Sequence, residues 1–222
     1  MNINLLNKPA ILVMDLDLTL HNVISSYDES VNETIKHFGY EYLSKEQLDS
    51  LSDNFIDSRD MLAQHISHDK LDEAVEYHFN HFLSREIPPN ALLPGANQLL
   101  ESVKNDFNLP ILGITNTNQL MAEKILRDLK VFDKFNFVIG IKEGNLPKPD
   151  PQMLLLALNQ VSSIPGPHVW FVGDRISDTQ CAKESNCTAI RFYHKIKPED
   201  KYADLFVNSH YQLFDIISSK LK

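Results

Sequence analysis

The sequence predicts an α/β protein in which a parallel sheet flanked by helices carries an inserted, all-helical domain. After residue 92, short apolar runs alternate with amphipathic helical patterns, as in a parallel sheet with crossover helices. The first apolar run, Ile11 to Met14, lacks polar alternation and is typical of a strand buried on both faces. Residues 21–92 break the alternation, because they contain helical patterns and no convincing strand.

The elements of the sheet follow in chain order. Strands are expected at 10–15, 110–115, 136–140, 168–172 and 188–192, and helices near 95–105, 119–129, 151–160 and 178–186. The segment DLFVNSHYQLFDII near the C-terminus predicts a last short strand and a closing helix. Together these elements predict a core made of residues 1–20 and 93–222.

The interrupting segment, residues 21–92, is too long for a loop and too apolar for disorder. Its amphipathic stretches are SVNETIKHF, SKEQLDSLSDNF, SRDMLAQHI and DKLDEAVEYHFNHFLSREI. We therefore expect a separate helical domain joined to the core by two linkers, near 21–27 and 87–95, which form a hinge.

Composition limits the function classes. The chain has 222 residues, 43% of them hydrophobic, and a net charge of −9, which argues against nucleic acid as a partner. No apolar run approaches the ~20 residues of a membrane span, and the N-terminus lacks a signal-peptide pattern. We expect a cytoplasmic monomer or homodimer that has no membrane partner. Cys181 and Cys187 are expected to be reduced structural thiols.

Asp15 and Asp17 directly follow the first strand. On an extended chain their i, i+2 spacing points both carboxylates to the same side. Strand exits of open α/β sheets are where ligands bind. Two carboxylates held this close repel each other unless a cation lies between them or one of them takes a proton. Mg²⁺ is a hard cation that prefers oxygen ligands and suits this arrangement. The alternative is a turn that happens to contain two acids.

Further polar groups follow later apolar runs at Thr115–Asn116, at Lys148 within KPDP, and at Asp174 and Asp178 within GDRISD. Each has an ordinary structural explanation: a turn or helix N-cap, a solvated turn lysine, and a helix cap. The functional explanation gains weight because all of them fall at one edge of one predicted sheet.

In this order, DxDxT, Thr-Asn, Lys in KPDP and GDxxxD, the chain resembles a haloacid dehalogenase-superfamily hydrolase over residues 10 to about 190. The resemblance implies a Rossmann-like core, and it identifies the helical insertion as a type-1 cap. It places the chain near phosphoglycolate phosphatases and β-phosphoglucomutase-like enzymes. A cap of this kind would exclude water from the site and contribute substrate contacts.

The resemblance implies roles for the carboxylates. Asp15 is expected to be the nucleophile that forms an aspartyl-phosphate, and Asp17 the general acid and base. Mg²⁺ would be bound by the Asp15 and Asp174 carboxylates and the backbone carbonyl of Asp17. Asp178 would support this metal shell directly or through water.

The remaining motifs are implied to bind phosphate. The Thr115 hydroxyl and the Asn116 backbone N–H would hold the transferring phosphoryl group, while Lys148 would neutralise charge on that group and on Asp15. Two departures from the family pattern stand out. Leu18 replaces the usual glycine after Asp17 and is expected to pack against the cap. Arg175 stands where a small residue is common and is expected to pair with acids at the rim.

Candidates within 21–92 are fewer. Arg59, in DSRDML, resembles the cap stretch that reaches the site in related phosphatases and phosphomutases, where a guanidinium suits a substrate carboxylate or phosphate. An equally good explanation is that Arg59 is a surface arginine that pairs with Asp57 or Asp60. The i, i+3 pairs His65/His68 and His78/His81 have metal-ligand spacing, but polar-face or interfacial positions are the more ordinary explanation.

The sequence therefore predicts a Mg²⁺-dependent phosphatase that acts on a small phosphorylated metabolite. Two alternatives stay open. One is β-phosphoglucomutase-like phosphoryl transfer, and the other is a catalytically weak protein that binds a phosphate ligand for regulation. Dehalogenase chemistry is disfavoured, because a leaving halide needs no proton from Asp17.

Overall fold

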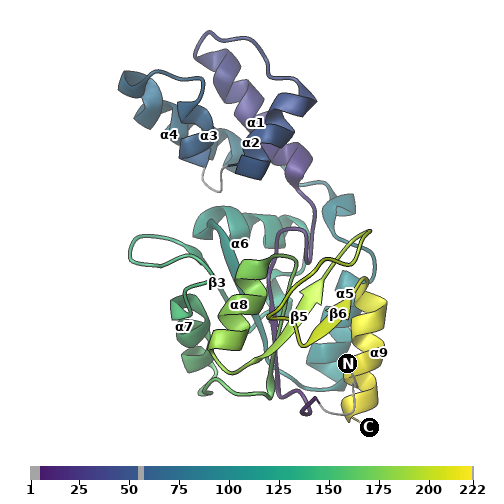
Figure 1. Ribbon diagram of the computed structural model, residues 1–222. Helices are drawn as coiled ribbons and strands as arrows, with labels where there is room; N and C mark the ends of the chain where they lie inside the picture. The colour runs from purple at the N-terminus through teal and green to yellow at the C-terminus, as the bar shows by residue number, and fades with distance from the viewer. Residues whose placement is uncertain (1–5, 55–57, 222) are drawn as a thin grey trace. The chain divides into compact units, whose positions relative to one another are not determined.

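The computed structural model describes residues 6–54 and 58–221 and divides into two compact units (Figure 1). One unit, the core unit, comprises Met1–Asn22 and Pro88–Lys222, and the other, the helical unit, comprises Val23–Ile87. The helical unit lies slightly inside the 21–92 range expected from the sequence. The two units are described separately below.

The core unit contains a six-stranded sheet in the order β3-β2-β1-β4-β5-β6, and every pairing in it is parallel. The strands are β1 (Ile11–Met14), β2 (Ile111–Asn118), β3 (Phe137–Ile141), β4 (Val169–Gly173), β5 (Thr188–Phe192) and β6 (Leu205–Val207). All four residues of β1 are buried, because the strand is central and helices cover both faces. The α/β fold class predicted from the sequence is confirmed.

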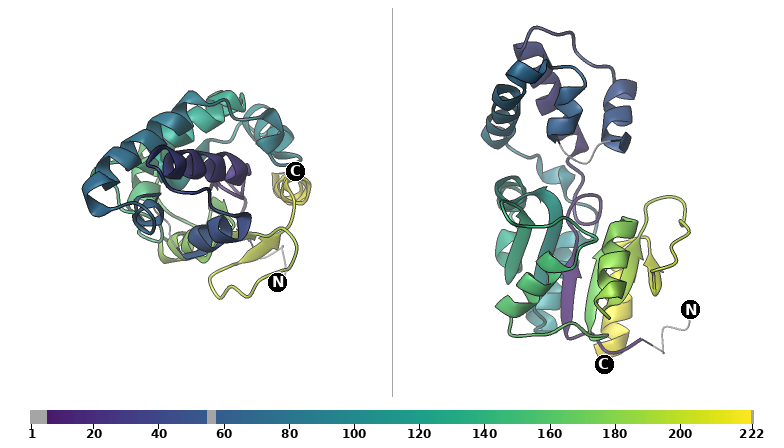
Figure 2. Two further views of the ribbon diagram at one scale, coloured as in Figure 1. Left: turned by 90° about the horizontal axis from the view of Figure 1, so that it is seen from above. Right: turned by 60° about the vertical axis from the view of Figure 1, so that its left-hand side comes forward.

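Helices flank the sheet on both faces (Figure 2). They are α5 (Ala96–Glu101), α6 (Gln119–Asp128), α7 (Gln152–Gln160), α8 (Ile176–Glu184) and α9 (His210–Leu221). One apolar cluster joins α7 and α8 to β1, β2 and β4. Chain direction across the sheet reverses after β3, so right-handed crossovers place α5 and α6 on the face opposite α7 and α8. This reversal beside β1 creates the switch point at which such sheets bind ligands.

The helical unit contains α1 (Ile24–His37), α2 (Lys45–Asn54), α3 (Ser58–Ala63) and α4 (Leu71–Ser84). It has an apolar core of its own, which includes Val31 and Ile35 of α1, Leu62 of α3 and Ala74 of α4. Residues 55–57, which begin with the last residue of the second amphipathic stretch, lie outside the described residues. The amphipathic stretches thus form helices because each has an apolar stripe that the others bury.

Most predicted elements agree with the structure to within one or two residues, and two differ for physical reasons. The expected strand 110–115 continues to Asn118, because β2 pairs with β3 again at Asn118 and Ile141 after a register irregularity. The expected helix 95–105 ends as α-helix at Glu101, and Ser102–Asp106 continues as a wider π-helical segment. Among the described helices, none is long and apolar enough to cross a membrane.

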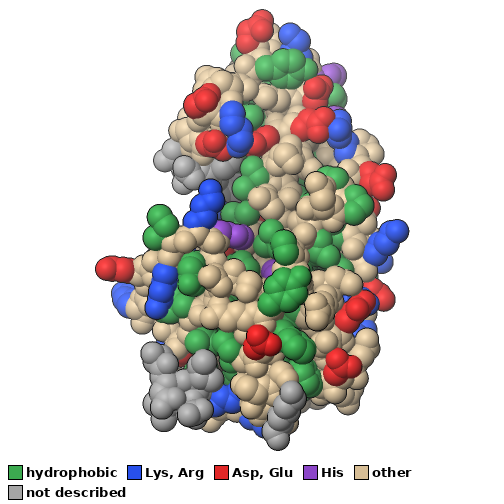
Figure 3. Space-filling view, turned by 90° about the vertical axis from the view of Figure 1, so that its right-hand side faces the viewer, with side chains coloured by type: hydrophobic (Ala, Val, Ile, Leu, Met, Phe, Trp, Pro, Cys, Tyr) green, Lys and Arg blue, Asp and Glu red, His purple; other side chains and the backbone are tan. Residues whose placement is uncertain are grey.

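The surface of the protein carries acidic and basic side chains interspersed with polar and apolar ones on the face drawn in Figure 3. The chain has a net charge of −9, and the basic side chains on that face are scattered and do not gather into a broad patch.

Candidate active site

Polar side chains from three neighbouring strands meet at the carboxyl edge of the core sheet. Asp15 follows β1, Thr115 lies near the end of β2, and Asp174 follows β4. Because β1 lies between β2 and β4 in the sheet, these residues converge on one point. The edge predicted from the sequence motifs is the edge where the structure places them.

Asp15 is the centre of this cluster and is 5% exposed. Its Oδ1 accepts a hydrogen bond from Lys148 Nζ at 2.6 Å, and its Oδ2 accepts one from the Thr19 hydroxyl at 2.8 Å. Burial raises the pKa of Asp15 well above its ordinary value, Lys148 opposes this, and the neighbouring carboxylates add to it. The carboxylate is therefore fixed in orientation while its negative charge is destabilised.

Lys148 is equally buried and is the cation nearest to Asp15. Its Nζ also donates to the Ile114 carbonyl at 2.9 Å and lies 2.7 Å from Asp178 Oδ1. Burial alone would lower the pKa of Lys148, but Asp15 and Asp178 outweigh it and raise that pKa. Lys148 thus stays charged although it is buried.

The loop that carries Lys148 is held by the side chain of Asn116. The Lys148 backbone N–H donates to Asn116 Oδ1 at 2.8 Å, and Asn116 Nδ2 donates to the Lys148 carbonyl at 3.2 Å. The sequence motif assigned Asn116 a backbone contact with phosphate. Its side chain has a further task here, because it clamps the KPDP loop to the end of β2.

Asp17 is held apart from Asp15 by a different set of contacts. Its Oδ2 accepts hydrogen bonds from Thr115 Oγ1 at 3.1 Å and from Thr117 Oγ1 at 2.7 Å. Its side chain is 34% exposed, and Oδ1 lies 3.9 Å from Nδ1 of the buried His21. Asp17 therefore keeps access to solvent, which Asp15 lacks.

Asp174 and Asp178 complete the acidic cluster with Asp15. One oxygen of each of the three lies within 4.8 Å of the others. Burial, and then Asp178, raise the pKa of Asp174 to about 6, while Arg175 and Arg191 oppose the rise. Three carboxylates gathered around one lysine leave an excess of negative charge at this edge.

Asp178, like Asp15, has both of its carboxylate oxygens engaged. Oδ2 accepts the Arg175 backbone N–H at 2.9 Å, which caps the start of α8, and Oδ1 faces Lys148. A Cβ on Gly173 would lie 2.3 Å from the Asp178 Cβ, so the close approach of α8 requires glycine there. Asp178 consequently positions Lys148 and the helix start.

The donor set fits a hard divalent cation. Asp15 and Asp174 offer carboxylate oxygens at close range, and no nitrogen or sulfur donor belongs to the cluster within the described part of the chain. Oxygen-only donors with excess negative charge suit Mg²⁺ better than softer metals. The residues present therefore fit the metal expected from the sequence.

Three further residues around the site, one of them the Thr19 of the DxDxT motif, received no role from the sequence. Thr117 holds Asp17, Thr19 holds Asp15, and His21 lies beside Asp17 with neither ring nitrogen hydrogen-bonded. Thr117 had one usable signal, because in a strand the i, i+2 spacing from Thr115 places both hydroxyls on the same side. His21 had none, since its burial depends on the turn that follows Asp17.

The candidates within the helical unit are found in ordinary structural settings. Arg59, on α3, forms a 2.6 Å ion pair with Asp72 of α4; Asp57, one of the partners considered, lies outside the described residues. His78 Nδ1 and His81 Nδ1 lie 3.1 and 3.2 Å from the Ser30 hydroxyl. These histidines are interfacial, in agreement with the simpler explanation.

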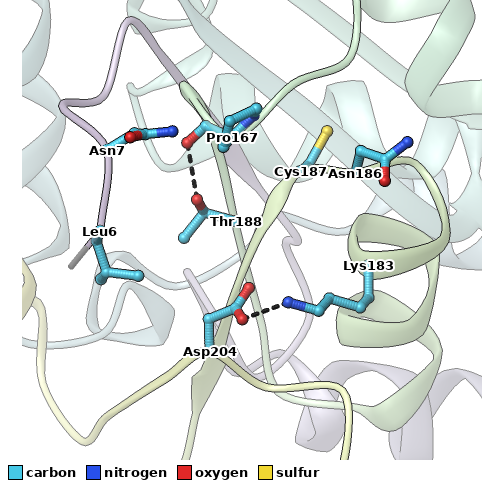
Figure 4. A pocket seen from close by; sticks show the side chains of 8 residues that line it. All are labelled: Leu6, Asn7, Pro167, Lys183, Asn186, Cys187, Thr188 and Asp204. Atoms are coloured by element: carbon cyan, nitrogen blue, oxygen red, sulfur yellow. Dashed lines mark hydrogen bonds and ion pairs between the residues drawn. The ribbon is translucent and has the colours of Figure 1, made fainter. Parts of the chain in front are cut away.

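A hollow of about 290 Å³ lies at the amino ends of β4, β5 and β6, and Figure 4 shows the residues that line it. The acidic cluster lies at the opposite, carboxyl edge of the sheet. Its charged residues, Lys183 and Asp204, pair with each other, and the Thr188 hydroxyl donates to the Pro167 carbonyl at 2.8 Å. Cys187 also lines it, and burial raises the pKa of that thiol. The two charged side chains of this hollow neutralise each other, in contrast to the acidic cluster.

Comparison with known proteins identifies the class. The family model for haloacid dehalogenase-like hydrolases matches residues 12–192. The chain therefore belongs to the haloacid dehalogenase-like hydrolase family, as the order of its motifs predicted.

Two individual relatives within this family show which kinds of enzyme the chain is similar to. A phosphoglycolate phosphatase of Chromobacterium violaceum is 27% identical over 215 aligned positions, covering 92% of this chain and 95% of that protein. An N-acetylmuramic acid 6-phosphate phosphatase of Pseudomonas aeruginosa is 30% identical over 113 positions, covering 49% and 50%.

Two solved structures share the fold. A protein from Haemophilus somnus described as a predicted phosphoglycolate phosphatase has a TM-score of 0.80 at 18% identity, covering 94% of this chain and 97% of its own. The β-phosphoglucomutase of Clostridium difficile has a TM-score of 0.74 at 22% identity, covering 96% and 97%. At these identities the likeness shows a common fold, which both enzyme classes use.

Proposed function

We propose that this protein is a Mg²⁺-dependent phosphatase that hydrolyses a small phosphate monoester through an aspartyl-phosphate on Asp15. The observation that carries the proposal is the 2.6 Å contact of Lys148 with Asp15 beside a separately held Asp17. One carboxylate is buried and clamped, and the other is partly exposed. Family membership supports the same chemistry.

Asp15 supplies the nucleophilic oxygen. It attacks phosphorus, and the bond from phosphorus to the leaving alkoxide breaks as the bond to Asp15 forms. Lys148 stabilises the negative charge that gathers on the transferring oxygens, and it costs no reorganisation because Asn116 and Asp178 already hold it. When bound to Asp15, Asp174 and the Asp17 carbonyl, Mg²⁺ would offset the repulsion between the carboxylate and the phosphate dianion.

Asp17 moves the protons. In the first step its carboxylic acid protonates the leaving alkoxide, and in the second its carboxylate takes a proton from the attacking water. Water then forms a bond to phosphorus, the bond to Asp15 breaks, and both the Asp15 carboxylate and inorganic phosphate are released. The hydroxyls of Thr115 and Thr117 aim one Asp17 oxygen and leave the other accessible.

We propose further that the helical unit serves as the cap, with Arg59 contributing to substrate binding. The support is its position in the chain, since it is inserted between β1 and β2 and joined through two connections at residues 22–23 and 87–88. Phosphoglycolate phosphatases are among the relatives that share most of the chain's length, so 2-phosphoglycolate is the first substrate to test.

The test is release of inorganic phosphate by the purified full chain. The panel contains 2-phosphoglycolate, N-acetylmuramic acid 6-phosphate and hexose phosphates, each with Mg²⁺ and with EDTA. We expect stoichiometric, Mg²⁺-dependent phosphate release from at least one monoester without a bisphosphate activator. Isomerisation of a hexose 1-phosphate with little free phosphate would establish the mutase instead, and binding without turnover would establish the regulatory alternative.

A further inference from the structure

The turn that joins Asp17 to the helical unit contains a strained residue. Leu18 has φ of 58°, in the left-handed region that a leucine rarely adopts because its side chain crowds the backbone there. Glycine would enter this region without that crowding. Contacts from other parts of the fold must therefore hold this turn, residues 17–21 and called the Leu18 turn below, in place.

Two histidines from distant parts of the chain contact this turn. His194, just after β5, donates from Nε2 to the Leu18 carbonyl at 2.7 Å. His210, at the start of α9, lies with Nε2 at 2.9 Å from the Thr19 carbonyl and Nδ1 at 3.1 Å from the Pro94 carbonyl. The Phe192 ring packs against both imidazoles, with centroids 5.4 and 5.0 Å away.

These contacts fix the peptide planes on both sides of Thr19. The Leu18 carbonyl belongs to the plane before Thr19, and the Thr19 carbonyl to the plane after it. Because peptide planes are rigid, fixing both sets the direction of the Thr19 side chain, whose hydroxyl bonds Asp15. The same turn is closed by the Leu18 N–H, which donates to the His21 carbonyl at 2.7 Å.

The Leu18 N–H bond also sets the Asp17 carbonyl. The carbonyl and the N–H of one trans peptide point in opposite directions, so the bond from Leu18 to His21 aims the Asp17 carbonyl away from His21. This carbonyl is one of the oxygens proposed to bind Mg²⁺. The backbone of residues 17–19 therefore controls one proposed metal ligand and the hydrogen-bond partner of the nucleophile.

We propose that His194 is a positioning residue for the phosphatase reaction: its hydrogen bond to the Leu18 carbonyl holds the strained turn that orients Thr19 and the Asp17 carbonyl. His210 anchors the same turn from the buried side. The inference rests on the proposed function for its kinetic consequences, while the hydrogen bond itself can be tested without turnover. His194 is exposed, so it can be replaced without opening the core.

The kinetic experiment is a double-mutant cycle between His194 and Leu18 with p-nitrophenyl phosphate and saturating Mg²⁺. We expect H194A to lower kcat about 10-fold with little change in KM, and about 3-fold or less in the L18G background, where the turn is no longer strained. H194Q should recover most of the loss, because the glutamine amide donates to a carbonyl as Nε2 does.

Two control variants test whether the effect of H194A depends on the Leu18 turn. Lys130 also has a positive φ, of 59°, but lies remote from the site after α6, so K130G should not change the effect of H194A. His168 precedes β4 at the opposite edge of the sheet, and H168A should leave kcat unchanged. Equal losses from H194A in the wild-type and L18G backgrounds, or no rescue by glutamine, would overturn the proposal.

A readout without turnover separates this inference from the proposed function. The amides of Thr19, Leu20 and His21 donate to the Leu16 carbonyl, so their hydrogen exchange reports opening of the turn. In metal-free protein, H194A should speed this exchange and H168A should not, and imidazole nitrogen spectra should show Nε2 of His194 protonated. If the wild type has no phosphatase activity but the exchange responds, only the proposed function fails. An unchanged exchange rate overturns the positioning role.

Discussion

The core unit and the helical unit treat buried polar groups in opposite ways. At the carboxyl edge of the core sheet, Asp15, Lys148 and Asp178 are at most 5% exposed and carry an excess of one charge. In the helical unit, the buried Ser30 hydroxyl contacts His78, and burial lowers the pKa of His78 to about 4, so this buried imidazole is neutral at pH 7. The ion pair of Arg85 with Glu29 lies at the surface, and the buried Asp28 pairs with the exposed Lys45.

This difference distinguishes the candidate active site of the core unit from the structural packing inside the helical unit. Buried like charges cost free energy, so their retention at one edge of a sheet indicates a chemical task. A neutral, hydrogen-bonded centre and exposed ion pairs are what packing alone requires, and such exposed pairs contribute about 0–1 kcal/mol each. Four predictions test this contrast, beginning with the largest effect.

The largest effect is expected from Asp15→Asn. An amide cannot attack phosphorus, so kcat should fall by about 10⁴-fold or more while the protein remains folded. Phosphate release and circular-dichroism melting measure the two consequences. The exposed Asp106→Asn is the matched control and should behave as wild type. Near-normal, Mg²⁺-dependent turnover by Asp15→Asn would remove the nucleophile assignment.

The second effect, expected from Asp17→Asn, distinguishes the proton-transfer role of Asp17 from the nucleophilic role of Asp15. An aryl phosphate has a good leaving group that needs little protonation, so Asp17→Asn should slow phosphoenzyme formation about 10-fold with an aryl ester and about 100-fold or more with an alkyl ester. Dephosphorylation stays slow for both, because water still needs a base, and the phosphoenzyme should accumulate in rapid-quench experiments.

Thr117→Val serves as the control for this experiment, since it removes one hydrogen bond to Asp17 and retains the carboxylate. It should show a smaller loss with the same preference for aryl esters. If Asp17→Asn slowed both esters equally and trapped no phosphoenzyme, Asp17 would be a structural residue at the metal.

The third effect is a pH dependence of opposite sign in the two units, measured by denaturant unfolding in EDTA. The pKa of Asp174 is raised from 3.8 to about 6, so the folded protein binds this proton more tightly than the unfolded chain does. The charged form therefore destabilises the fold above about pH 6, and this cost is relieved as pH falls from 6 towards 4. Relative to Asp174→Asn, wild type should gain up to about 2–3 kcal/mol over that range.

His78 should respond in the other direction. Its pKa is lowered from 6.5 to about 4, so the folded protein holds it neutral while the unfolded chain protonates it. Stability linked to His78 is complete above pH 6.5 and is lost as pH falls towards 4, by up to about 2–3 kcal/mol. His78→Gln should remove this dependence. The same pH slope for both variant pairs would contradict the contrast between the units.

The smallest effect is expected from the surface of the helical unit. Arg59→Ala should change the free energy of unfolding by less than about 0.5 kcal/mol, because its partner Asp72 is highly exposed. Its proposed substrate role should instead raise KM about 10-fold for 2-phosphoglycolate and leave p-nitrophenyl phosphate unaffected. Arg85→Ala, with the same 46% exposure, should leave both KM values unchanged. An unchanged KM for Arg59→Ala would place that arginine outside the site.

Local pattern determined much of the core and its chemistry. The continuous apolar run 11–14 defined a doubly buried strand, and alternation after residue 92 defined the parallel sheet. Polar residues at strand ends were assigned to one edge because parallel strands place their carboxyl ends together. The expected partners of Asp15 and the family followed from the order of the motifs, which is read directly along the chain.

Tertiary structure decided which atoms meet. The two contacts of Asn116 with Lys148 and the hold of Thr117 on Asp17 join segments that are 32 and 100 residues apart, and Asp178 reaches Lys148 from the start of another helix. The histidine contacts to the Leu18 turn join residues 176 and 191 positions apart. Hydrogen bonds require an approach of about 3 Å in a set direction, which sequence periodicity does not specify. The sequence by itself determined the fold and the chemical groups at the site, and the packing of distant segments decided how those groups are oriented.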